Sequence, residues 1–89
     1  MDKAQIVGTL EELLPETERV MLPDDFEDFN VIVTSLKVDP ANTHSGNGVV
    51  NPQDFATYLT RHASQNPVYQ QNGAVNLFYR IASVLRQIR

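Results

Sequence analysis

Oxygen-bearing side chains alternate through a stretch of turn-forming residues near the middle of the sequence. Thr43, Ser45 and Asn47 stand two positions apart, Gly48 follows them directly, and the carboxylate of Asp54 comes six positions later. Hydroxyl, amide and carboxylate oxygens at alternate loop positions are ligands for a hard cation such as Ca²⁺, and a glycine permits the sharp turn between them.

The segment 43–59 resembles the calcium loop of the EF-hand family. The match consists of Gly48 at the sixth loop position, Val50 at the apolar eighth, Asp54 at the twelfth, and Phe55 and Leu59 at the start of the exiting helix. Thr43 and Ser45 stand where the family usually has carboxylates, so one formal negative charge would face the cation. The resemblance implies a single helix-loop-helix calcium-binding module with ligands from Thr43, Ser45, Asn47 and Asp54, and no other cofactor is expected. The alternative is an ordinary turn-rich loop that leads into a well-capped helix.

Other groupings of reactive residues do not make an enzyme site. His44 and His62 are 18 positions apart and the sequence has no cysteine, so a zinc site lacks ligands. Ser45, His62 and Asp54 can be combined into a triad, but neither a nucleophile elbow nor an oxyanion turn accompanies them. The sequence therefore predicts a protein without catalytic residues.

Charge divides the sequence into an acidic half and a basic half. Residues 1–40 hold ten acidic residues against three basic ones, a net charge of −7, whereas residues 41–89 hold four arginines against Asp54, a net charge of +3. Four arginines that do not cluster neutralise few phosphates, so we expect no nucleic-acid partner. Two interpretations stay open: the halves attract each other within one fold, or between copies of the chain.

Candidate interface residues come from both halves. They are Asp24, Asp25, Asp28, Tyr79, Arg80 and Arg86. Adjacent residues of a helix point about 100° apart, so of Phe78 and Tyr79 one should lie near the surface. We favour Tyr79, because it stands beside Arg80 and because tyrosine and arginine are enriched at interfaces. The expected partner is a protein, either a different one or another copy.

Apolar side chains recur with helical spacing in four segments. The helices are expected from Asp2 to Leu14, from Asp24 onward, from Asn51 to the Asn66-Pro67 break, and from Ala74 nearly to Arg89. We expect Pro15 to end the first helix, because proline lacks the backbone N–H that a helix interior needs. Residues 15–23 then form a connector whose Val20, Met21 and Leu22 enter the core. The β-branched run at 31–33 makes a strand the alternative there.

These segments predict an all-α fold, a small four-helix bundle-like domain that spans residues 1–89 and has a Gly-rich central loop. A chain of 89 residues can bury one modest core. No apolar run approaches the roughly 20 residues that span a bilayer. With no cysteine in the sequence, we expect a cytoplasmic location without a membrane span.

Asn51-Pro52, Tyr58, Tyr69 and a helix that ends at Arg89 form a second pattern. It is similar to that of the needle and inner-rod subunits of bacterial type III secretion systems, which implies a small helical assembly subunit. Pro67 departs from this pattern, because it interrupts a helix that the family keeps continuous. The leading hypothesis is a non-enzymatic protein–protein interaction or assembly module, with self-association as one form of it. The calcium module and the secretion-type subunit are the alternatives.

Overall fold

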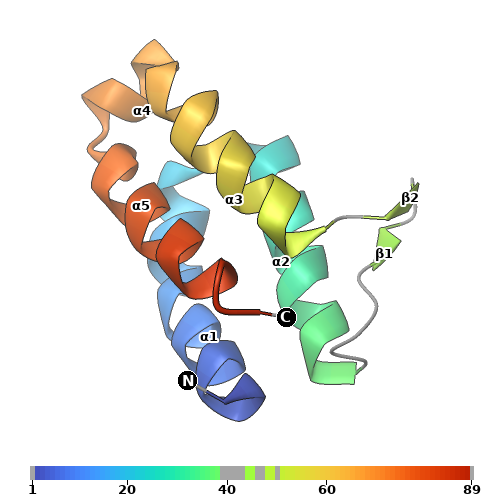
Figure 1. Ribbon diagram of the computed structural model, residues 1–89. Helices are drawn as coiled ribbons and strands as arrows, with labels where there is room; N and C mark the ends of the chain where they lie inside the picture. Colours follow the sequence, from blue (N-terminus) through green and yellow to red (C-terminus); the bar gives the residue numbers. More distant parts are fainter. Residues whose placement is uncertain (1, 39–43, 46–47, 50, 89) are drawn as a thin grey trace.

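Helices dominate the computed structural model, which describes residues 2–38, 44–45, 48–49 and 51–88 (Figure 1). The helices are α1 (Lys3–Val20), α2 (Pro23–Val38), α3 (Pro52–Arg61), α4 (Pro67–Gln71) and α5 (Ala74–Leu85), with a 3₁₀ turn at Ala63–Gln65. Strands β1 (His44–Ser45) and β2 (Gly48–Val49) form a short antiparallel pair. The all-α prediction is confirmed. Most of the expected Gly-rich loop lies outside the described residues.

The first helix begins as its sequence predicts but does not end at Pro15. The side chain of Asp2 accepts a hydrogen bond from the Gln5 N–H, and the Gln5 side chain accepts one from Asp2, so the two form a reciprocal cap. Pro15 is exposed inside α1, which continues to Val20. The prediction of a connector starting at Pro15 was wrong. The last turns are held by packing, because Thr17 is buried and its hydroxyl bonds to a carbonyl of the preceding turn.

The second helix starts one residue earlier than expected, at Pro23, and contains the whole β-branched run. Phe29, Ile32, Val33 and Leu36 are all buried, which is the helical spacing that the sequence indicated. The strand alternative for residues 31–33 is therefore wrong. A fixed apolar stripe facing the core outweighs the weak preference of β-branched residues for strands.

Two Asn-Pro pairs start helices in the second half of the chain. The side chain of Asn51 accepts hydrogen bonds from two N–H groups in the first turn of α3. The side chain of Asn66 accepts one from an N–H group in the first turn of α4. In both helices proline occupies the first turn, where no N–H is needed. We predicted the Asn66-Pro67 pair only as the end of a helix, and α4, which starts there, was not predicted. Gly73 then links α4 to α5 with a left-handed φ of 77°.

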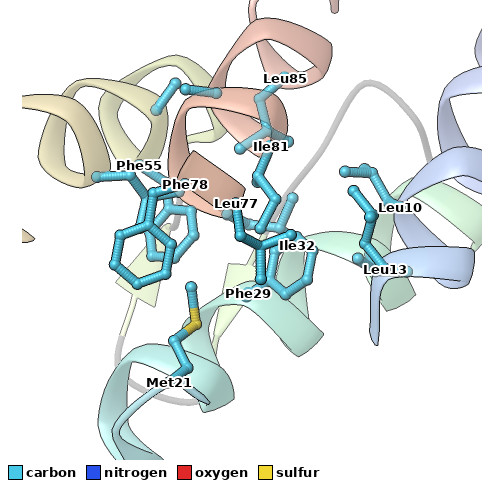
Figure 2. Close-up of a cluster of buried hydrophobic side chains, with 14 of the residues drawn as sticks. Leu10, Leu13, Met21, Phe29, Ile32, Phe55, Leu77, Phe78, Ile81 and Leu85 are labelled. Atoms are coloured by element: carbon cyan, nitrogen blue, oxygen red, sulfur yellow. The ribbon is translucent and has the colours of Figure 1, made fainter. Parts of the chain in front are cut away.

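The helices form two antiparallel pairs, α1 with α2 and α3 with α5, which pack together around one core (Figure 1). Figure 2 shows buried side chains of both pairs pointing into this core. The rings of Phe29 and Phe55 stack at 6.2 Å between centroids, joining α2 to α3. Tyr69 meets Phe78 edge-on at 4.6 Å, joining α4 to α5. In the part of the chain that the structure describes, no helix is both long and apolar enough to cross a membrane.

Candidate interaction surface

The predicted calcium ligands fall mostly outside the described residues. Thr43 and Asn47 lie there entirely, and Ser45 is described only as a backbone position opposite Gly48 in the β1–β2 pair. Asp54 is exposed on the first turn of α3. Among the described residues, no group of three or more His, Cys, Asp or Glu side chains gathers around a common point. Calcium binding by this loop stays a prediction.

Asp54 and His62 lie at opposite ends of α3. Asp54 belongs to the first turn and His62 follows the last residue, which separates the two by about 12 Å along the helix axis. A hydrogen-bonded acid–base pair between them is therefore out of reach. His62 is exposed, and its ring stacks on that of Tyr58 at 6.2 Å between centroids.

The carboxylate of Asp25 faces inward from the first turn of α2 and binds two tyrosines. The Tyr58 hydroxyl lies 2.9 Å from each carboxylate oxygen, and the Tyr69 hydroxyl donates to Oδ2 at 2.5 Å. The start of the helix also favours a negative charge at this position. Asp25, predicted as an interface residue, thus has a role inside the molecule. No sequence pattern predicts this cluster, because Tyr58 and Tyr69 stand 33 and 44 positions from Asp25.

The two tyrosine hydroxyls of this cluster stay protonated. Burial, then the hydrogen bond to Asp25, raises the pKa of Tyr58 to about 12. The same two causes raise the pKa of Tyr69, whose side chain is fully buried. Tyr69 also accepts a hydrogen bond at 2.9 Å from the N–H of Leu22, in the turn between α1 and α2. Both hydroxyls therefore act as structural donors, and the cluster fixes the α1–α2 turn against α4.

The remaining acids at the start of α2 have no cationic partner among the described residues. Asp24 and Glu27 are exposed, while Asp28 is partly buried. Partial burial, followed by repulsion from Asp25, Glu27 and Asp24, raises the pKa of Asp28. Within the described chain the ion pairs amount to Lys37 with Glu11, at 3.3 Å and exposed. The start of α2 therefore carries uncompensated negative charge.

Tyr79, Arg80 and Arg86 lie on one side of α5. Together with Asn76 and Ser83 they form what we call the α5 outer face, since all five side chains are exposed and each lies three or four positions from another member of the set. Tyr79 is 52% exposed, as the sequence predicted. Arg80 forms no ion pair with another described residue, and Arg86 donates to the Thr60 hydroxyl at 3.1 Å. An aromatic ring and two cations thus share one accessible surface.

A second exposed apolar site lies where α4 meets the α1–α2 turn, and the sequence analysis did not find it. Leu22 is 41% exposed and Val68 is 48% exposed. We call these two residues, with Asp24 and Glu27, the turn surface. Leu22 was expected in the core together with Val20 and Met21, but of the three only Met21 is buried and Val20 is partly buried. The Leu22 prediction was wrong, because the Tyr69 hydroxyl holds the backbone of Leu22 and its side chain points outward.

No protein-family model, curated protein or solved structure matches this chain. The resemblance to secretion-system subunits stays a prediction, as does the resemblance to EF-hand loops.

Proposed function

We propose that this protein is a non-enzymatic interaction or assembly module that binds an acidic protein surface through the α5 outer face. The observation that carries the proposal is the pair Tyr79 and Arg80: a half-exposed aromatic ring beside a cation that is unpaired within the described residues. A cytoplasmic location belongs to the same proposal.

The chemistry of this pair suits protein recognition. A tyrosine ring contributes a large apolar area with little loss of conformational freedom, and arginine binds carboxylates in a bidentate geometry. Because Arg80 has no ion pair with another described residue, binding a partner's carboxylate breaks none of the described ion pairs. The ring of Tyr79 can shield the contact between Arg80 and the partner's carboxylate from water. Exclusion of water strengthens this ion pair.

A titration with a defined acidic probe tests this proposal. The probe is a synthetic amphipathic peptide of about 16 glutamate, alanine and leucine residues, added to the ¹⁵N-labelled full chain. We expect chemical-shift changes concentrated at Tyr79, Arg80 and Arg86, weakened by about 0.5 M salt because the contact is electrostatic.

Two variants complete the test. Arg80→Glu should weaken peptide binding about tenfold or more, since it places like charges together. Arg61→Glu makes the same charge change at an exposed position of α3 and should have a much smaller effect. Equal losses in both variants, or no localised shifts at about 1 mM peptide, would show that the α5 outer face is not a binding site.

A further inference from the structure

Large apolar side chains are exposed at two sites of the described molecule. Leu22 and Val68 belong to the turn surface, and Tyr79 belongs to the α5 outer face. The two surfaces carry opposite charge, because the exposed acids Asp24 and Glu27 follow Leu22 within the first five residues of α2, whereas Arg80 and Arg86 follow Tyr79. Each surface therefore has exposed apolar side chains beside charged ones, and the charges of the two surfaces are opposite in sign.

The turn surface is held in place before any partner binds. The Leu22 N–H donates to the Tyr69 hydroxyl at 2.9 Å, and the Asn72 side chain donates to the Val20 carbonyl at 2.9 Å. These two bonds fix both sides of the contact between α4 and the α1–α2 turn, and the ring of Tyr69 beneath them is fully buried. A fixed surface loses little conformational entropy on binding, which favours affinity.

The charge at the turn surface also favours a cationic partner. Asp24, Asp25, Glu27 and Asp28 lie within two turns of one helix, and repulsion among them contributes to the raised pKa of Asp28. An arginine brought in from outside would reduce this repulsion as well as pair with a carboxylate. The gain is largest next to Asp24 and Glu27, because their side chains are exposed, whereas that of Asp25 accepts hydrogen bonds from two tyrosines.

We propose that the turn surface of one copy of this chain binds the α5 outer face of a second copy. This inference rests on the proposed function and names the partner in it. The contact would cover the three large apolar side chains that are exposed in the described residues and would pair the unpaired acids of α2 with Arg80 and Arg86. Because the two surfaces differ, the contact is heterologous, and each copy offers one surface of each kind.

Complementation between two variants tests a heterologous contact directly. Arg80→Glu disables the α5 outer face and leaves the turn surface intact, whereas Glu27→Lys does the reverse. Each variant alone should raise the dissociation constant for self-association about tenfold or more, measured by sedimentation over a range of concentrations. An equimolar mixture should form a mixed complex of near wild-type affinity, because one intact surface of each kind remains and the two reversed charges also attract each other.

Matched controls separate this contact from general charge effects. Glu12→Lys and Arg61→Glu make the same charge changes at exposed positions on α1 and α3, and they should associate like the wild type. Circular dichroism confirms that each variant is folded. Equal weakening by the controls, or a mixture that fails to form the complex, overturns the proposal.

The wild-type chain decides between the two proposals. A monomer at every concentration up to about 1 mM overturns the second-copy inference. If the α5 outer face of that monomer still binds the acidic peptide, the proposed function stands and the partner is a different protein. If the peptide does not bind either, both proposals fail.

Discussion

The hydroxyl of Tyr69 lies 2.5 Å from a carboxylate oxygen of Asp25, joining α4 to the first turn of α2 across 44 positions of sequence. The same hydroxyl accepts the N–H of Leu22. One buried group therefore connects three parts of the chain: the α1–α2 turn, the start of α2 and the short helix α4. The ring itself packs on Phe78 of α5, so the connection reaches the core.

Replacing Tyr69 by phenylalanine should destabilise the protein by about 1–3 kcal/mol. The variant keeps the buried ring but removes both hydrogen bonds of its hydroxyl, one of them to a charged acceptor. Urea unfolding at pH 7 measures the loss. Tyr58→Phe should cost less, about 1 kcal/mol, because water can reach that half-buried site. Tyr79→Phe is the control, since the Tyr79 side chain is exposed. A Tyr69→Phe variant as stable as the control would mean that the hydroxyl bonds contribute nothing.

The raised pKa of Asp28 leads to a prediction about pH. A carboxyl whose pKa is higher in the folded state favours folding while it is protonated, below its ordinary value of 3.8. This contribution is lost as pH rises through the folded-state pKa, because the ionised group is partly buried among Asp25, Glu27 and Asp24. Asp28→Asn should therefore raise the melting temperature at pH 7, and the difference should vanish near pH 3.

Thermal unfolding at the two pH values checks this prediction. Glu12→Gln makes the same charge change at an exposed position away from the cluster, so it reports the effect of net charge alone. If Asp28→Asn and Glu12→Gln change the melting temperature equally at pH 7, the repulsion around Asp28 is not the cause.

The parts of the fold that the sequence predicted are those fixed by local rules. The Asn51-Pro52 start of α3 and the apolar stripe of α2 follow from the geometry of one helix, and the structure has both. The prediction at Pro15 was wrong because the local cost of proline is outweighed by the packing of Leu13 and Thr17, two positions away on either side, which no local rule contains. The cluster of Asp25 with its tyrosines was missed for a similar reason. Hydrogen bonds between distant residues leave no periodic signal.

The position of Pro15 inside α1 predicts an easy gain in stability. A proline in a helix interior costs about 3 kcal/mol or more, and part of this is returned because proline also restricts the unfolded chain. Since Pro15 is exposed, alanine fits without repacking the core. Pro15→Ala should stabilise the protein by about 1–2 kcal/mol in urea unfolding. Pro67→Ala is the matched control, because Pro67 stands in the first turn of α4 and should give no gain. Equal effects would contradict a helix that continues through residue 15.

The resemblance of the 43–54 loop to an EF-hand predicts weak calcium binding. A site with one formal negative charge should bind far less tightly than sites with three or four carboxylates, so we expect saturation only at millimolar Ca²⁺. Amide NMR shifts of Gly48 and Asp54 during a calcium titration measure it. Asp54→Asn should abolish the shifts, and Mg²⁺ serves as the control cation. The absence of any movement at millimolar calcium removes the metal interpretation and leaves the loop as a connection between α2 and α3.

The side chain of Gln53, which belongs to α3, caps the C-terminal end of α5. Its side-chain amide donates to the carbonyls of Leu85 and Ile88, at 3.2 and 2.7 Å. The Leu85 carbonyl also accepts the Ile88 N–H at 3.1 Å, whereas the Ile88 carbonyl lies past the end of α5, so the Gln53 amide gives that carbonyl a partner. Gln53→Ala should destabilise the protein by about 1 kcal/mol and speed amide hydrogen exchange at residues 86–88 more than in α1. Gln53→Glu should be at least as harmful, because a carboxylate cannot donate and is repelled by the negative end of α5. Unchanged exchange at 86–88 in both variants would show that α5 ends without help from α3.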